Sequence, residues 1–226
     1  MKAKLSELKK QVFIRFILAF IFIGLTLFLP AGTLDYWQAW IYCAVIFIPV
    51  IFVLFYFLKK DPELLERRMR MREKEEKQKT IIKIAFILFF IGFIIPGLDY
   101  RYHWSNVPVA LVIAANAIVL FGYIFVFFVL RENSYASRII EVEKGQKVIT
   151  TGAYAIVRHP MYLGVLLMYL FTPLALGSYW AIIFFLPLFP LIVFRLLNEE
   201  EVLLRELPGY KEYCQKTRYH LVPFIW

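Results

Sequence analysis

Two short polar segments stand out in an otherwise apolar chain because their side chains can bind a charged ligand. The first contains Arg158, His159 and Pro160, directly before a run without any charge. The second is the acidic triplet at 199–201, about forty positions further on. Arg and His donate hydrogen bonds, and adjacent carboxylates need a cation or donors to compensate them. If the segments meet, they can bind a zwitterionic ligand with a carboxylate at one end and amino, hydroxyl or sulfonium groups elsewhere.

The position of Pro160 strengthens this interpretation. Proline is favoured as the first residue of a helix, and the unpaired N–H groups of a first helical turn favour a carboxylate or phosphate. Tyr154 and Tyr162 flank the same point and offer flat, amphipathic surfaces for stacking. We therefore expect a ligand site where this helix begins.

The missing motifs narrow the chemistry. The sequence has no GxSxG, HExxH, Walker A or GxGxxG pattern. Its three histidines and two cysteines are scattered, which argues against a metal site. No pattern indicates an activated nucleophile. Methyl transfer from a sulfonium donor needs none, because the acceptor attacks in line while the protein positions and desolvates the reactants.

The elements that position these segments are membrane spans. The 226 residues are 61% hydrophobic and only 19% charged, far outside the usual soluble composition. Uncharged runs cover 16–34, 36–58, 84–98, 104–130 and 160–194. A crossing takes about 20 apolar residues, so the third run needs residues 81–83 to reach full length, while the last is too long for one span. We divide that run at Gly177-Ser178 into two short helices joined by a tight turn. The sequence thus predicts an all-α, polytopic integral membrane protein with about six transmembrane helices.

The net charge of +9 follows the same topology. With the N-terminus in the cytoplasm, the outer loops contain only Arg101 of the 26 Lys and Arg residues. This pattern indicates orientation and attraction to anionic lipids, and it argues against a nucleic-acid partner. Both termini and both polar segments then lie on the cytoplasmic side. Because the hairpin between the segments is nearly minimal in length, we expect His159 and Glu200 to be neighbours in space.

The chain is expected to have two parts. Residues 1–130 hold the first four spans, with a basic cytoplasmic helix near 61–80 that begins at Asp61 and Pro62. This helix either lies on the membrane surface or is a solvated linker that sets orientation. Residues 131–226 hold the loop, the hairpin and the C-terminal helix.

Three smaller expectations concern single residues. Asn116, inside the fourth span, is expected to hydrogen-bond a neighbouring helix. Tyr210, Tyr213 and Tyr219 are expected to dock on the membrane surface. His103 is expected only to anchor its outer loop at the interface.

A resemblance sharpens these expectations. The stretch VITTGAYAIVRHPMYLG at 148–164, followed by a hairpin and then EEVLLRELPGYKEY at 200–213, closely resembles the isoprenylcysteine carboxyl methyltransferase family. That family is related to the phospholipid methyltransferases. The match covers roughly 131–226, while the first four spans match only in hydropathy. It implies S-adenosyl-L-methionine as donor, in a cytoplasm-facing pocket between the loop after the fourth span, the start of the fifth and the C-terminal helix.

The resemblance also implies roles for single residues. Glu200 matches the family's acidic cofactor residue, and Arg195, one residue out of register, is the candidate that meets the acceptor's carboxylate. We take Arg195 and Glu200 as the catalytic pair. The expected cofactor contacts are Gln146, Lys147, Val148, Ile149, Tyr154, His159, Pro160, Met161, Tyr162 and Glu200, with no metal ligand among them.

The expected function is an integral membrane, S-adenosylmethionine-dependent methyltransferase acting on a lipid-like or prenylated acceptor. Carboxyl O-methylation of an isoprenylcysteine-like group comes first. The alternatives are N-methylation of a phospholipid or other amine, a nicotinamide-dependent sterol reduction on a related fold, and a non-enzymatic membrane protein or transporter. The few polar residues within the spans disfavour the last. The compact chain indicates the plasma membrane of a bacterium or archaeon, with membrane lipids as its surroundings.

Overall fold

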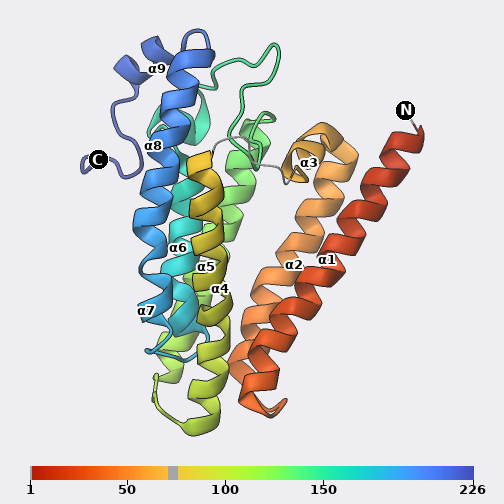
Figure 1. The fold of residues 1–226 in the computed structure, drawn as a ribbon, viewed down its shortest axis with the longest axis vertical. Coiled ribbons are helices and arrows are strands. Elements are labelled where there is room, and N and C mark those ends of the chain that lie inside the picture. The colour runs from red at the N-terminus through yellow and green to blue at the C-terminus, as the bar shows by residue number, and fades with distance from the viewer. Residues whose placement is uncertain (1, 71–75) are drawn as a thin grey trace.

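The computed structural model describes residues 2–70 and 76–226, and within this part of the chain the regular structure is helical (Figure 1). An isolated parallel bridge between Val157 and Tyr219 is the one β-type pairing in these two ranges. The elements in order are α1 Lys2–Ala31, α2 Trp37–Lys60, α3 Pro62–Arg68, α4 Glu76–Tyr102, α5 Val109–Glu132, the 3-10 helix η1 Gly152–Ala155, α6 Pro160–Ala175, α7 Ile182–Phe185, α8 Leu188–Glu206 and α9 Tyr210–Lys216. The all-α prediction is confirmed.

Within the described residues, five helical segments are long and apolar enough to cross a bilayer: Leu5–Ala31, Trp37–Lys60, Gln78–Tyr102, Val109–Glu132 and Ile182–Glu206. Helix α6 is a sixth, shorter apolar helix of 16 residues. At about 1.5 Å per residue it is shorter than a hydrocarbon core of about 30 Å, so at least one of its ends lies within that layer's depth. The predicted polytopic membrane fold is therefore confirmed, with one span shorter than the rest.

Several helix bounds differ from the apolar runs. Helices α1 and α4 begin at Lys2 and Glu76, well before those runs, because the Lys- and Glu-rich residues there are good helix formers. The basic helix expected near 61–80 is shorter, since α3 ends at Arg68 and residues 71–75 lie outside the described part. Its start is as expected: the Asp61 side chain accepts a hydrogen bond from Leu64 N at 3.0 Å.

The hairpin between α6 and α8 turns where the sequence places it. Gly177 has φ +74°, a left-handed conformation that favours glycine, and Leu176 O accepts from the Tyr36 hydroxyl at 2.5 Å. Asn116 Nδ2 donates to Ala175 O at 3.0 Å, which confirms the interhelical hydrogen bond expected of this residue. The far end of α6 is thus fixed to α2 and α5.

Two glycines bring α5 and α6 into close contact. A Cβ added at Gly164 would lie 2.6 Å from Val126 Cγ2 and 3.0 Å from the Gly122 carbonyl oxygen. Small residues allow helix backbones in membranes to approach in this way. The contact holds the first turns of α6 against the last turns of α5, where the loop of residues 133–151 begins.

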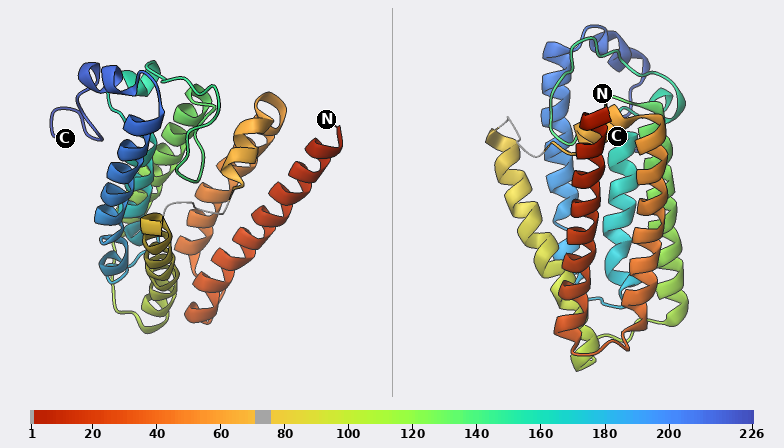
Figure 2. Two further views of the ribbon diagram at one scale, coloured as in Figure 1. Left: turned by 45° about the horizontal axis from the view of Figure 1, so that its top comes forward. Right: turned by 90° about the vertical axis from the view of Figure 1, so that its right-hand side faces the viewer.

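One end of the bundle collects the polar segments. Figures 1 and 2 show the N-terminus, α3, the loop between α5 and α6, α9 and the C-terminus together at that end. The short loop between α4 and α5, with Arg101 in the last turn of α4, lies at the opposite end. The bundle therefore presents its basic segments on one side.

Candidate functional site

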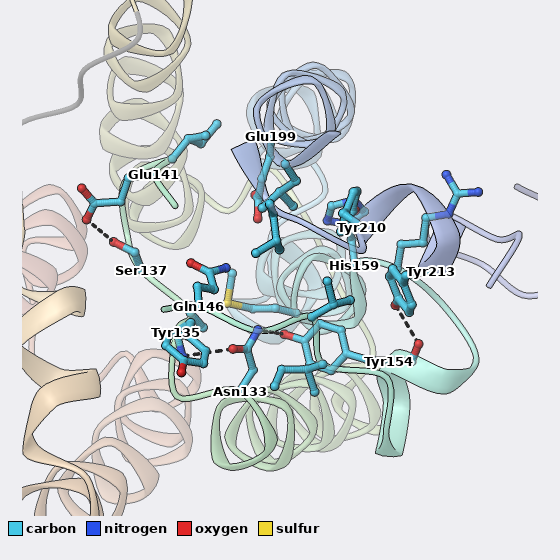
Figure 3. A pocket seen from close by; sticks show the side chains of 18 of the residues that line it. Asn133, Tyr135, Ser137, Glu141, Gln146, Tyr154, His159, Glu199, Tyr210 and Tyr213 are labelled. Atoms are coloured by element: carbon cyan, nitrogen blue, oxygen red, sulfur yellow. Dashed lines mark hydrogen bonds between the residues drawn. The ribbon is translucent and has the colours of Figure 1, made fainter. Parts of the chain in front are cut away.

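A pocket opens at the polar end of the bundle. Its wall comes from the loop at 133–149, η1, the start of α6, the end of α8, and α9 (Figure 3). Its empty volume, including the mouth, is about 830 Å³. Segments far apart in the sequence thus line one concave site.

Most of the residues expected at the site line this pocket. They are Gln146, Lys147, Val148, Ile149, Tyr154, His159, Met161, Tyr162 and Arg195. Two lie behind the lining. Pro160 is the first residue of α6, and Glu200 lies behind His159.

Buried Glu200 is the centre of an ionic cluster. Its Oε1 lies 3.2 Å from His159 Nε2 and 3.2 Å from an Arg158 NH1 nitrogen, and its Oε2 lies 3.0 Å from His220 Nδ1. These contacts confirm that the two polar segments meet across the hairpin. One carboxylate thus compensates one guanidinium and hydrogen-bonds the His159 imidazole, with the His220 imidazole close beside it.

His220 is the member of this cluster that sequence reasoning did not assign to the site. Its ring stacks on Trp226 with centroids 4.8 Å apart. Burial lowers the pKa of His220 below its usual value near 6.5, despite the opposing effect of Glu200. The imidazole is therefore mainly neutral at pH 7.

Arg158 holds the C-terminal tail rather than projecting freely. Its guanidinium donates to Thr217 O at 2.7 Å and to Cys214 O at 3.0 Å. The backbone N–H groups of Arg158 and His159 donate to the carbonyls of Tyr219 and His220 at 2.9 and 3.0 Å. These hydrogen bonds hold the C-terminal tail against the residues that begin α6.

A second polar cluster faces the pocket. The buried Tyr162 hydroxyl donates to Glu199 Oε2 at 2.5 Å and accepts from Arg195 Nε at 3.1 Å. Arg195 also donates to Gln78 Oε1 at 2.9 Å, on α4. The cluster places opposite charges on either side of one phenol, at a wall shared by α6 and α8.

Two tyrosines expected on the membrane surface are not there, and that prediction is wrong. Tyr210 and Tyr213 are each only 4% exposed and line the pocket. They pack with Leu207 and Val148, because Gly209 at φ +83° turns α9 back onto the pocket loop. An aromatic face suits a protein surface as well as a membrane interface, and here it covers the pocket.

The pocket tyrosines differ in their partners. Tyr154 accepts a hydrogen bond from Asn133 Nδ2 at 3.0 Å, and burial raises the pKa of Tyr154 to about 12. The Tyr213 hydroxyl donates to Tyr154 O at 2.7 Å. The Tyr210 hydroxyl is buried without a hydrogen-bond partner among the described residues, and the weakly polar thiol of Cys214 lies beside it.

The unpaired hydroxyl tests whether the residues fit a polar cofactor. A buried hydroxyl without a partner costs free energy, and a polar ligand in the pocket would offset that cost. Figure 3 shows Gln146, Glu199 and Tyr210 around the same space, from the loop, α8 and α9. Carboxylate, amide and phenol groups of this kind match the amino, carboxylate and hydroxyl groups of a zwitterionic nucleoside, so the residues fit.

A support of the pocket that sequence reasoning missed comes from α3. Arg67 donates to Ser134 O at 3.0 Å, and Arg68 donates to Ser137 O at 3.2 Å. Arg70, just beyond α3, pairs with Glu141 and Glu143. The opposite charges of the 67–70 and 141–143 stretches were the available signal. The expectation of a membrane-surface helix or a solvated linker did not anticipate this contact.

Comparisons with known proteins bear on the same region. Residues 110–209 match the phospholipid methyltransferase family model. Over 90 residues the chain is 30% identical to the Delta(14)-sterol reductase of Mus musculus. The matched stretch covers 38% of this chain and 22% of that protein. The chain thus spans about a fifth of the length of this curated relative.

A solved structure shares the fold. It is a eukaryotic intramembrane Ras methyltransferase, isoprenylcysteine carboxyl methyltransferase. The TM-score is 0.53 at 19% identity, over 90% of this chain and 74% of the other. The matched residues 110–209 include α6, α8 and the loop and 3-10 helix η1 between α5 and α6, which contribute most of the pocket wall.

Proposed function

We propose that this chain, whose residues 110–209 match the phospholipid methyltransferase family model and whose fold is shared with an isoprenylcysteine carboxyl methyltransferase, methylates a lipid-associated carboxylate with S-adenosylmethionine. The resemblance predicted from the sequence is confirmed at the level of this family. The donor, the acceptor and the residue roles are our proposal. The observation that carries it is the pocket at the start of α6, where residues 158–162 meet Glu199 and Glu200. The Tyr210 hydroxyl, which has no hydrogen-bond partner among the described residues, lies at the same pocket.

The proposed donor site uses the loop and the start of α6. Apolar and backbone groups of 146–149 would line one side, and Tyr154, Met161 and Tyr210 would contact the purine and ribose. Glu199 supplies negative charge for the positively charged end of the ligand. Glu200 acts through His159, whose ring it fixes at 3.2 Å, so Glu200 is a positioning residue in this proposal.

S-adenosylmethionine, when bound, supplies a methyl group that a carboxylate oxygen accepts in line, while the carbon–sulfur electron pair leaves with the sulfur. A carboxylate acceptor has no proton to lose, so no side chain needs to act as a general base. The chain's contribution is to orient both partners and to exclude water. Tyr162 and Arg195 would hold the acceptor's carboxyl group at the wall they share.

The membrane placement supports a lipid acceptor. Because α6 is shorter than the hydrocarbon core, a lipid tail can lie beside the bundle while its head group reaches the start of α6. We propose that this end faces the cytoplasm, since the basic residues of α2, α3 and the C-terminal tail gather there.

Amine methylation of a phospholipid is the second candidate, favoured by the match of residues 110–209 to the phospholipid methyltransferase model. An amine acceptor must lose a proton, and Glu199 with Tyr162 is the pair best placed to take it. The two candidates share the donor site and differ in the stability of the product to base.

One experiment separates these functions. Purified protein in lipid nanodiscs is incubated with methyl-labelled S-adenosylmethionine and a membrane extract, and the labelled lipid is then treated with base. Release of labelled methanol identifies an ester, whereas label that resists base identifies a methylated amine. Absence of S-adenosylmethionine binding in calorimetry would refute the proposal, and binding of NADPH instead would favour a sterol reductase.

The site assignment has its own test. The double variant His159→Ala, Glu200→Ala should lose S-adenosylmethionine binding while keeping its helical circular dichroism. Unchanged binding would place the donor elsewhere and leave the methyltransferase proposal standing.

A further inference from the structure

Arg68 reaches the pocket from outside the region that matches the methyltransferase family. It is the last residue of α3, whereas the match covers residues 110–209. One terminal nitrogen of Arg68 lies 3.2 Å from Ser137 O and 3.7 Å from Met161 Sδ. Ser137 and Met161 both line the pocket, on the loop and on α6. The guanidinium therefore bridges two walls of the site from behind.

The charge of Arg68 is poorly compensated. Within the described part of the chain, no carboxylate oxygen lies within 4 Å of it, while Arg67 pairs with Glu63 at 3.1 Å and Arg70 pairs with Glu141. Its hydrogen-bond acceptors among the described residues are a carbonyl oxygen and a thioether sulfur, and neither carries a charge. Isolated buried cations are costly unless an anion pairs with them.

The electrostatic surroundings of Arg68 also favour an anion beside it. Burial is the largest influence on the pKa of Arg68 and lowers it, Tyr162 opposes this effect, and the nearby positive charges of Arg138 and Arg195 lower the pKa further. Burial also lowers the pKa of Arg138. Arg68 thus lies near Arg138 of the loop and Arg195 of α8, and an anion beside Arg68 would offset the cost of burying its charge.

We propose that Arg68 assists Arg195 in selecting the acceptor, by reaching the acceptor's carboxylate from the side of Ser137 and Met161. This inference rests on the proposed methyltransferase function and adds a second arginine, from outside the matched region, to the recognition of the acceptor's charge. The planar guanidinium can donate two parallel hydrogen bonds to a carboxylate, which fixes the acceptor oxygen in place. Acceptors without the negative charge gain nothing from Arg68.

The test uses a prenylated carboxylic acid and its uncharged counterpart. S-Farnesyl N-acetylcysteine serves as acceptor, and its carboxamide serves as a competitive inhibitor. For Arg68→Gln we expect the KM for the acid to rise roughly 10- to 100-fold, the loss of one charge-assisted hydrogen-bonded pair. The Kd for S-adenosylmethionine and the Ki of the carboxamide should stay within about threefold of wild type.

Two further variants distinguish a loss of acceptor recognition from a general loosening of α3. Arg68→Lys keeps the charge without the planar fork and should lie between wild type and Arg68→Gln in KM. Arg67→Gln removes a hydrogen bond between α3 and the same loop at Ser134 O, so it reports the effect of loosening α3. A rise in KM that is equal for Arg67→Gln and Arg68→Gln, or an equal loss for acid and carboxamide, would overturn the proposal.

Failure of the proposed function gives a different result. A wild-type protein that binds no S-adenosylmethionine refutes the methyltransferase proposal before any variant is compared. A wild type that methylates the acid, with an unchanged KM in Arg68→Gln, refutes the role of Arg68 alone.

Discussion

Replacing Glu200 by glutamine removes the negative charge at the centre of the ionic cluster while keeping the shape of the side chain. The carboxylate lies 3.0–3.2 Å from two imidazoles and one guanidinium, and its side chain is only 9% exposed. A hydrogen bond to a charged group at such a site contributes about 1.5–3 kcal/mol. Because glutamine retains one acceptor oxygen, we expect the free energy of unfolding to fall by an amount near the lower end of that range, about 2 kcal/mol.

Two measurements check this value. The melting temperature should fall, since Arg158 stays buried without its counter-charge. S-adenosylmethionine binding should weaken by up to about 30-fold, the factor that corresponds to 2 kcal/mol, because a neutral amide holds the His159 ring less firmly than the carboxylate does.

The neighbouring residue is a matched control. Glu201 is exposed, and its carboxylate lies 3.4 Å from the Asn198 amide. Glu201→Gln makes the same change of charge one residue away and should leave both values close to wild type. Equal effects of the two variants would mean that net charge, and not the contacts of Glu200, determines binding, and the reasoning would then fail.

Three other perturbations test separate parts of the structure. Tyr210→Phe should leave the melting temperature unchanged or slightly higher, since the hydroxyl has no hydrogen-bond partner among the described residues, but should weaken S-adenosylmethionine binding several-fold in calorimetry; unchanged binding would exclude this hydroxyl as a ligand contact. Gly164→Ala should destabilise the protein by about 1–3 kcal/mol in chemical unfolding, because its Cβ would meet Val126 at 2.6 Å. The lowered pKa of His220 means that the unfolded chain binds the proton more readily, so stability falls as the pH drops through about 6.5. His220→Gln should therefore flatten the fall in melting temperature between pH 7 and pH 5, and an unaltered slope would contradict the assigned shift.

The helices and the meeting of the two polar segments could be predicted because they follow from simple rules. Apolar length defines spans, and a short hairpin forces His159 and Glu200 together whatever the details of packing. The 3.2 Å contact between them needed no knowledge of side-chain conformations. The division of the chain at residue 130 stays a prediction.

The contacts of α3 and α9 could not be predicted in the same way. Tyr210 and Tyr213 give a pattern that fits a membrane interface and a protein surface equally, and only the turn at Gly209 decides between them. Arg67 and Arg68 bind backbone carbonyls of an irregular loop, and such contacts leave no periodic signal in the sequence. Charge clusters are commonly solvated, so the opposite charges of 67–70 and 141–143 were only a weak signal of this contact.

The pairing of the C-terminal tail with the start of α6 has a consequence for biosynthesis. Arg158 and the carbonyl of Thr217 are 59 positions apart, and α6, α7 and α8 lie between them. A ribosome releases residues in order, so the first turn of α6 enters the membrane before its partners exist. The site is therefore completed only after the whole hairpin has been inserted. A nascent chain halted within α8 would be integrated in the membrane, but its pocket would lack the side formed by α9 and the C-terminal tail.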